Sequence, residues 1–328
     1  MKICIQMLSK NSDRSLTGKG KFFKRLRAEF EKMGIEVTYD PKKKVDIDVC
    51  INKPLWWPKN SKRKVIRLGP CEYDSNRKDL KECWHVARKY AKSCHGIIYQ
   101  SAFSKMANHA FLRTSGLCDE AVIHNGSTAD GAMHTFGLAG GGPHFLASTR
   151  EWTLEKSLDT IIEAFLDAAI PQSTLHVCGT VWDKPKRFPL ENRKLLKKYG
   201  KQVIFLGETS QEDLNAYYYQ CAALIHLVYW DSCANAVAEA MQFGIPIICG
   251  DNCGTMEYIN KERGIIVPFN KSLPFKPWNR RKPPKVDKNV LSEAMWKIKD
   301  FPRYDPPDEF HISAIAKKYK EFFEGVLG

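Results

Sequence analysis

Two acids frame the segment of this sequence that is best suited to chemistry. Asp231 follows an apolar run, and Glu239 comes after seven further residues, within the otherwise apolar stretch from Ala236 to Met241. A carboxylate in such a place can accept two hydrogen bonds, which is what a vicinal diol such as a ribose offers. The Asp-x7-Glu pattern therefore indicates a site for a polyhydroxyl ligand.

The same segment predicts the start of a helix that could hold an anion. The small residues Ser232, Cys233 and Ala234 precede Asn235, and we expect a helix over Asn235–Phe243. The first N–H groups of a helix have no partner within it, and the helix dipole favours negative charge there. Because small side chains let a phosphate approach the backbone, this turn is interpreted as an anion site beside the two acids.

A parallel α/β scaffold is predicted to position these residues. A strand-like stretch at Lys2–Met7 is followed by a loop at Ser9–Gly20 and an amphipathic helix at Lys21–Met33. Units of strand, helix and strand build parallel sheets. The first half adds expected strands at Ile35–Tyr39, Val45–Ile51, Lys64–Leu68, Gly96–Gln100 and Ala121–His124, and helices at Lys78–Lys92 and Ala102–Ser115.

The alternation restarts after a linker. Residues 137–143 contain four glycines and a proline, which is typical of a flexible connection. The second half has expected strands at His144–Thr149, Leu175–Cys178, Val203–Leu206, Ala222–Val228 and Ile245–Cys249, and expected helices at Leu154–Ala169, Leu190–Tyr199 and Gln211–Gln220. The fold class that follows is α/β, with two Rossmann-like domains whose parallel sheets face a central cleft.

We expect three parts along the chain. Residues 1–143 form an N-terminal Rossmann-like domain on the acceptor side, residues 144–307 form the C-terminal domain, and residues 308–328 form a helix that packs back on the first domain. Ligands of open α/β sheets bind outside the carboxyl ends of the strands. The cleft between the two domains is therefore the expected site.

The segment around the two acids resembles the signature of family 4 glycosyltransferases, the large retaining class with the GT-B fold. A common variant of that family's pattern reads Asp-x-Cys-Pro-Asn-x-Val-x-Glu, and residues 231–239 match it with Ala234 in place of proline. Gly244-Ile-Pro-Ile-Ile and Gly254-Thr-Met-Glu257 are also similar to the family. The resemblance extends to Arg150 with Lys156 and to the strand that ends at Gly207.

The resemblance implies transfer of a sugar from a nucleoside diphosphate sugar to a hydroxyl group, with retention. The implied acceptor is a glycan, a glycolipid or other lipid-linked sugar, or a protein glycan, and the implied process is glycan biosynthesis. Arg150 and Lys156 would stabilise charge on the leaving diphosphate, and Asp231 would contact sugar hydroxyls near the anomeric carbon. The implied donor-binding residues are Gly18, Gly20, Gly207, Ser232, Cys233, Ala234, Asn235, Glu239 and Glu257.

No metal or other cofactor is expected, because arginine, lysine and a helix terminus replace the cation in the architecture that the sequence resembles. Asp46-Ile-Asp48 looks like the metal motif of a different glycosyltransferase fold, but it lies at the start of a predicted strand in the first domain. It is therefore interpreted as structural. A histidine common in the family is missing. His85 and His124 could each be proposed as a catalytic base, but both are interpreted as structural.

Composition indicates an anionic partner. The formal net charge is +14, in a chain with 43% hydrophobic and 27% charged residues. Its longest apolar runs are about ten residues, whereas a membrane span needs about 20. Eleven cysteines without a CxxC pair are typical of reduced thiols, so a cytoplasmic location is expected. Peripheral contact with an anionic membrane, through an amphipathic helix bearing Phe22, Leu26 and Phe30, stays open.

Three other functions remain as alternatives. The charge is compatible with a nucleic-acid-binding protein, but no zinc finger, recognition helix or aromatic RNA motif is present, so no nucleic-acid partner is expected. The aspartate at the first acidic position and the missing histidine are compatible with a catalytically inactive protein that binds nucleotide sugars or carbohydrates. A nucleotide-sugar epimerase of similar fold is the nearest alternative enzyme.

Overall fold

A computed structural model of the chain describes residues 1–6, 18–129, 131–134, 136–138, 141–181, 200–272 and 275–328. Contacts divide these residues into two compact units. The first lies within residues 1–127 and includes 275–279 and 308–328, and the second lies within 128–272 and includes 280–307. Each unit is described by itself below.

The first unit is built on a six-stranded parallel sheet with the order β2-β1-β3-β4-β5-β6. Its strands are β1 (Lys2–Ile5), β2 (Glu36–Thr38), β3 (Val45–Ile51), β4 (Ser61–Leu68), β5 (Gly96–Tyr99) and β6 (Asp119–Val122). All carboxyl ends of a parallel sheet meet at one edge, where polar residues of the connecting loops gather. The predicted α/β class is confirmed for this half of the chain.

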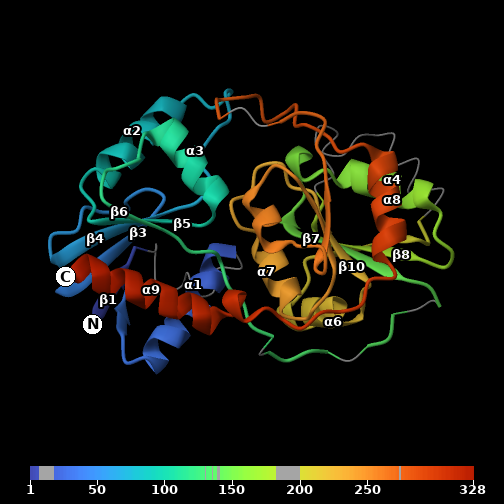
Figure 1. The fold of residues 1–328 in the computed structure, drawn as a ribbon, viewed down its shortest axis with the longest axis horizontal. Coiled ribbons are helices and arrows are strands. Elements are labelled where there is room, and N and C mark those ends of the chain that lie inside the picture. The colour runs from blue at the N-terminus through green and yellow to red at the C-terminus, as the bar shows by residue number, and fades with distance from the viewer. Residues whose placement is uncertain (7–17, 130, 135, 139–140, 182–199, 273–274) are drawn as a thin grey trace. The chain divides into compact units, whose positions relative to one another are not determined.

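Helices cover both faces of this sheet (Figure 1). Helices α1 (Gly18–Lys32) and α9 (Ile312–Leu327) pack on one face, and α2 (Leu80–Ala91) and α3 (Ala102–Leu112) pack on the other. Neighbouring residues of β4 alternate between the two cores, since Val65 joins the first and Ile66 the second. Because both faces of the sheet are buried, its strands consist largely of consecutive apolar residues.

The start of α1 differs from the expected loop. The helix begins at Gly18, so Gly18 and Gly20 lie in its first turn and not in a loop before it. The rest of the expected loop, residues 7–17, lies outside the described residues. Phe22, Leu26 and Phe30 are each 1% exposed and face the sheet core. The amphipathic face of this helix is therefore used for packing in the unit and is not free for a membrane.

Two segments from the end of the sequence complete the first unit. Tyr319 of α9 packs its ring against Phe22, Phe30 and Phe323, with ring centroids 5.8–6.4 Å apart. Residues 275–279 lie beside the loop after β4, where Trp278 stacks on Tyr73 with centroids 4.8 Å apart. The short helix η4 (Asp308–Phe310) leads into α9.

The second unit has its own six-stranded parallel sheet, with the order β12-β11-β10-β7-β8-β9. Its strands are β7 (His144–Glu151), β8 (Thr174–Thr180), β9 (Val203–Gly207), β10 (Ala223–His226), β11 (Ile247–Gly250) and β12 (Gly264–Val267). The helices are η2 (Leu154–Lys156), α4 (Leu158–Ala168), α6 (Gln211–Gln220), α7 (Asn235–Met241), η3 (Gly254–Tyr258) and α8 (Lys288–Ile298).

Sequence and structure differ at several elements of this unit. The helix expected over Leu154–Ala169 is broken at Ser157, whose φ of 52° is left-handed, so η2 and α4 are separate. The helix expected over Leu190–Tyr199 lies outside the described residues. Neither β12 nor α8 was expected. β12 is only four residues long, which is too short for a clear strand pattern. The helical spacing of α8 begins directly after a Pro- and Lys-rich stretch and was not recognised in the sequence.

The change of unit falls between Ser127 and Thr128, earlier than the linker expected at 137–143. Described residues between 132 and 138 pack on α6 of the second unit. Phe136 lies against Tyr217, with ring centroids 5.1 Å apart, and the Leu138 amide donates to the Gln220 side chain over 3.3 Å. These contacts, which no glycine-rich pattern reveals, assign the segment to the second unit.

Candidate active site

The candidate site lies where β7 and β10 end in the second unit. The two strands are neighbours at the centre of the sheet, so their carboxyl ends lie side by side. Arg150 is the next-to-last residue of β7, and its side chain is exposed. The strand end is anchored by Trp152, whose indole Nε1 donates to the Cys178 carbonyl over 3.0 Å. The structure therefore presents Arg150 to solvent from a fixed strand end.

Gly179 allows the close approach that this strand end requires. It has a φ of +105°, and a Cβ on it would lie 1.8 Å from the Thr149 carbonyl oxygen. Only glycine fits where the end of β8 passes so close to the backbone that carries Arg150. Sequence reasoning missed this residue, although a glycine at the end of a predicted strand is a recognisable signal.

Lys156 is held at the same end of the sheet. Its ammonium group donates to the Thr149 hydroxyl over 2.6 Å and to the Glu151 carbonyl. Burial lowers the pKa of Lys156, and the carboxylates of Glu155 and Asp231 oppose this shift only in part. An ammonium carries three protons, so the two bonds leave one N–H of Lys156 for another acceptor.

Asp231 follows β10 and closes a turn with one of its carboxylate oxygens. Oδ1 accepts the Cys233 amide over 3.0 Å, and the Asp231 carbonyl accepts the Gly254 amide over 2.8 Å. Oδ2 lies 3.5 Å from Nε2 of the buried His226, an ion-pair distance without the alignment of a hydrogen bond. The Asp231 side chain keeps 27% of its surface exposed, so it can still meet a ligand.

The pKa of Asp231 is lower than that of an ordinary aspartate. Burial raises it, but His226, the Cys233 amide and the charge of Lys156 together lower it by more. Asp231 is therefore ionised at neutral pH and can accept hydrogen bonds from hydroxyl groups. His226 was missed from the sequence, since it reads as one more residue of a buried strand.

Helix α7 carries Glu239 at 5% exposure, one turn after its start at Asn235. The helix spans seven residues, shorter than expected, and Ala234 at its N-cap makes no side-chain capping bond. The Cys233 amide, expected to bind the diphosphate, is instead used by Asp231. Ser232 and Ala234 are buried, whereas Asn235 is partly exposed.

Further predicted donor residues lie in the same unit. Gly207 ends β9 with a φ of +68° and open space around it. Glu257 lies in η3, which is tied to the site because the Tyr258 hydroxyl is 2.6 Å from Sγ of Cys233. Gly18 and Gly20 belong to the first unit, so their place relative to these residues stays a prediction.

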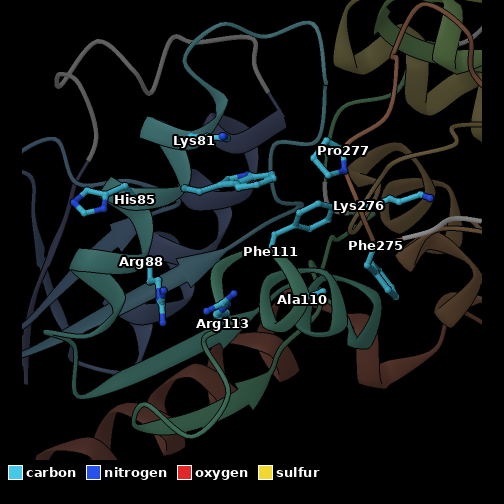
Figure 2. A pocket seen from close by; sticks show the side chains of 10 residues that line it. Lys81, His85, Arg88, Ala110, Phe111, Arg113, Phe275, Lys276 and Pro277 are labelled. Atoms are coloured by element: carbon cyan, nitrogen blue, oxygen red, sulfur yellow. The ribbon is translucent and has the colours of Figure 1, made fainter.

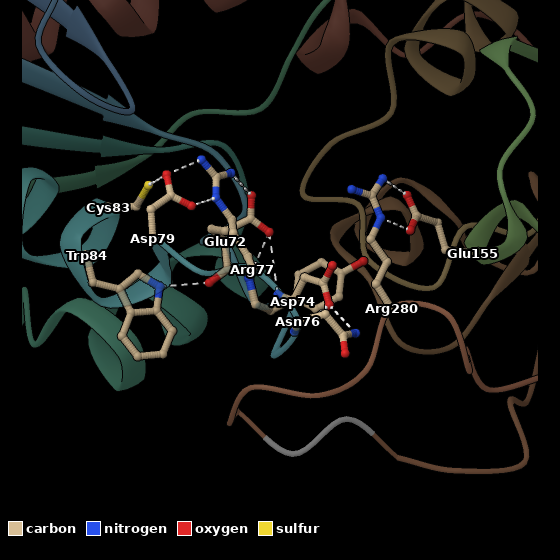
Figure 3. Close-up of polar contacts among 10 residues, drawn as sticks. Glu72, Asp74, Asn76, Arg77, Asp79, Cys83, Trp84, Glu155 and Arg280 are labelled. Atoms are coloured by element: carbon tan, nitrogen blue, oxygen red, sulfur yellow. Dashed lines mark hydrogen bonds and ion pairs between the residues drawn. The ribbon is translucent and has the colours of Figure 1, made fainter.

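A salt bridge between Glu155 and Arg280 adds a cation that the sequence did not reveal. Nε and Nη2 of the Arg280 guanidinium group each donate a hydrogen bond to one carboxylate oxygen of Glu155 (Figure 3). The Glu155 side chain is 10% exposed and that of Arg280 is 46% exposed. The charge of Arg280 also acts on Lys156. Glu155 and Arg280 are 125 residues apart, so no local pattern in the sequence predicts this pair.

The side chains of the Asp46-Ile-Asp48 motif have structural roles, which agrees with the interpretation from the sequence. Asp46 forms a salt bridge with Lys62 at 2.8 Å, and the buried Asp48 accepts the Gln6 side-chain amide over 2.5 Å. Among the residues that the structure describes, no three His, Cys, Asp or Glu side chains are grouped as ligands of a metal ion.

No described helix is both long enough and apolar enough to cross a bilayer.

Comparison with known proteins supports the GT-B interpretation. Residues 136–273 match the family of glycosyl transferases group 1, a stretch that contains Arg150, Lys156, Asp231 and Glu239. No curated protein sequence matches the chain. The likeness to family 4 in particular is not addressed by this match.

Solved structures share the fold over the whole chain. A sucrose-phosphate synthase from Thermosynechococcus elongatus is 16% identical, with 99% of both chains covered and a TM-score of 0.72. The Anabaena protein HepE in complex with UDP is 14% identical, with 99% of both chains covered and a TM-score of 0.68. A glycosyltransferase from Rickettsia africae ESF-5 is 15% identical, with 99% and 97% covered and a TM-score of 0.65. The fold is that of GT-B glycosyltransferases.

Proposed function

We propose that this protein is a glycosyltransferase that moves a sugar from a nucleoside diphosphate sugar to a hydroxyl group of a glycan, glycolipid or protein glycan. The observation that carries the proposal is the arrangement of Arg150, Lys156 and Asp231 at the ends of two adjacent strands, within the segment that matches glycosyl transferases group 1. Each of these residues has a task in that reaction.

Breaking the bond between the sugar and the diphosphate leaves negative charge on the diphosphate. Arg150 has an exposed guanidinium group at the strand end, and Lys156 has one N–H beyond its two bonds. In many enzymes, the largest contribution to rate acceleration comes from fixed charged groups that stabilise the charge developing in the transition state. We assign both to the leaving group, and Asp231 to the sugar hydroxyls.

Glu239 is assigned to the ribose of the donor. Its burial in α7 favours a bidentate contact with a diol over a solvated carboxylate. We further propose that the reaction proceeds with retention and without a metal ion, as in the family that the sequence resembles. The complex of HepE with UDP supports UDP as the first donor nucleotide to test.

Binding calorimetry with UDP, GDP and ADP tests the proposal. Arg150→Ala and Glu239→Ala should each weaken binding of the preferred nucleotide by at least about tenfold, because each loses a charge-assisted contact. The matched controls are Lys261→Ala and Glu262→Ala, which remove the same charges from an exposed loop of the same unit. Equal affinity in all four variants would remove the proposed donor site.

Turnover of the preferred nucleotide sugar separates an enzyme from a binding protein. An active protein releases the nucleoside diphosphate in the presence of acceptor, or slowly by hydrolysis in its absence. Binding without release of the diphosphate under either condition would favour the inactive binding protein that the sequence also allows.

A further inference from the structure

A cavity lies wholly within the first unit, and no residue assigned to sugar transfer lines it. It has a volume of about 470 Å³ and is formed by α2, the end of α3 and residues 275–277 (Figure 2). Small-molecule sites have volumes of roughly 300–1,000 Å³. The cavity is therefore large enough for a metabolite.

One face of α2 supplies most of the charged wall. Its pocket-lining residues follow the spacing of a single helix face and are Lys81, Trp84, His85 and Arg88. Arg113, just after α3, and Lys276 add two further cations. Figure 2 labels Lys81, His85, Arg88, Arg113 and Lys276 among the side chains that line the cavity, together with Phe111 and Phe275.

Among the described residues, no carboxylate forms an ion pair with these cations. The lining contains no acidic residue, α3 has none, and the one acid of α2, Glu82, lies outside the lining. The nearby acids Glu72 and Asp79 are both paired with Arg77, at 2.7 Å and 2.6 Å (Figure 3). A cavity that gathers positive charge without counter-charge favours an anionic ligand.

Arg88 gives the most direct sign of a missing partner. Its Nε is buried and has no hydrogen-bond partner among the residues that the structure describes. A buried donor without a partner destabilises the fold. A small rotation of the Arg88 side chain toward a ligand oxygen in the cavity would give Nε an acceptor.

The aromatic wall is fixed in place before any ligand binds. The indole Nε1 of Trp84 donates to the Glu72 carbonyl over 2.8 Å, and its ring lies against Phe111, with centroids 5.1 Å apart. Phe275 is held by Phe103, with ring centroids 6.0 Å apart. Such a wall suits a planar ring or an apolar chain attached to the anion.

We propose that this pocket binds a phosphate-bearing small molecule, with the phosphate held by Arg88 and Arg113 and its organic part lying against Trp84 and Phe111. Guanidinium groups match phosphate oxygens with paired hydrogen bonds, and aromatic rings supply apolar area at fixed positions. The proposal involves no residue of the second unit and stands independently of the proposed sugar transfer.

Phenyl phosphate is a suitable probe because it joins a ring to a phosphate monoester. Calorimetry with the full chain carrying Arg150→Ala and Glu239→Ala avoids binding at the proposed donor site. Phenyl phosphate should bind more tightly than inorganic phosphate, and phenol should not bind. In that background, Arg88→Gln and Arg113→Gln should each weaken phenyl phosphate binding at least about tenfold.

The matched controls are Lys89→Gln and Lys92→Gln, which remove the same charge from α2 and its C-cap but do not line the cavity. Arg113 is exposed, so its variant reports on the pocket even if the Arg88 variant fails to fold. Equal loss in controls and pocket variants, or no binding of phenyl phosphate at all, would overturn the proposal.

Vesicles separate two sources of the phosphate group. Flotation with phosphatidylcholine vesicles that contain phosphatidic acid tests a lipid phosphate, and pure phosphatidylcholine is the blank. Binding that is lost in Arg113→Gln but kept in Lys89→Gln assigns the pocket to a lipid phosphate. Binding of phenyl phosphate without flotation assigns it to a soluble phosphate ester.

Discussion

Arg280 forms a bidentate salt bridge with the nearly buried Glu155, the residue that precedes Lys156. Through its carbonyl, Glu155 also accepts the Tyr229 amide over 3.1 Å, which ties η2 to the chain that leads to Asp231. Arg280 thereby neutralises a carboxylate that would otherwise compete for Lys156. This makes Arg280 a positioning residue for the candidate site.

Removing Arg280 should weaken the site through Lys156. Arg280→Ala removes this salt bridge, so Glu155 attracts the Lys156 ammonium more strongly and draws it away from the leaving group. We expect kcat to fall about tenfold or more, with a smaller change in KM, as for loss of transition-state stabilisation. The double variant Glu155→Gln/Arg280→Ala should recover part of the loss, whereas a purely structural role predicts no recovery. Arg281→Ala on the same segment is the comparison.

Substitution of Gly179 should damage the strand end that carries Arg150. Gly179→Ala places a Cβ 1.8 Å from the Thr149 carbonyl oxygen in a backbone with a φ of +105°. We expect a loss of roughly 2–4 kcal/mol in the free energy of unfolding, because backbone must move on both strands. Urea unfolding followed by circular dichroism measures it.

Gly325→Ala is the matched control for that prediction. Gly325 lies within α9, and a Cβ there meets no atom within 4 Å. Alanine in an open helical position stabilises by roughly 0.5–1 kcal/mol. Similar losses in the two variants would contradict the close approach inferred for Gly179.

The second unit should lose stability in mild acid because of a buried histidine. Burial and the neighbouring His144 lower the pKa of His176 from 6.5 to about 4. The unfolded chain binds this proton first as the pH falls, so stability decreases from pH 6.5 towards pH 4 and is full above that range. The contribution is about 3 kcal/mol at most.

Urea unfolding at a series of pH values checks this expectation. His176→Gln should flatten the dependence between pH 6.5 and pH 4 relative to the parent protein. His85→Gln removes an exposed histidine of the first unit and should leave the dependence unchanged. An identical slope in both variants would show that another group is responsible.

The C-terminal helix should depend on a buried arginine of β4. Arg67 is 1% exposed, and its Nε donates to the Tyr319 hydroxyl over 2.6 Å while its guanidinium lies 4.7 Å from the centre of the Phe22 ring. Tyr319→Phe leaves this buried cation short of an acceptor, and we expect a loss of roughly 1–3 kcal/mol in the free energy of unfolding. Tyr219→Phe, at a side chain that is 60% exposed, should change it by less than about 0.5 kcal/mol.

Metal chelation should not affect the proposed reaction. Arg150 and Lys156 are assigned the charge that a divalent cation supplies elsewhere, so turnover in excess EDTA should equal that in buffer. Restoration of a lost activity by Mg²⁺ or Mn²⁺ would show that the two cations do not suffice.

The sequence by itself determined the parallel α/β architecture and the neighbourhood of Asp231 and Glu239. Both follow from local pattern: apolar strands buried on two faces, amphipathic helices of one period, and a small-residue turn between two acids. The features that the sequence did not predict are also local. The left-handed Ser157 and the short strand β12 have little effect on hydrophobic periodicity.

Only the tertiary structure decided which distant residues meet. Arg280 reaches Glu155 across 125 residues, and Tyr319 reaches Arg67 across 252. The Cys233 amide is used by Asp231, and four cations of the first unit, two of them outside α2, line one cavity. Periodicity reports which face of an element is buried, but a charged side chain finds its partner through chain topology, and a single sequence does not encode that pairing in any local pattern.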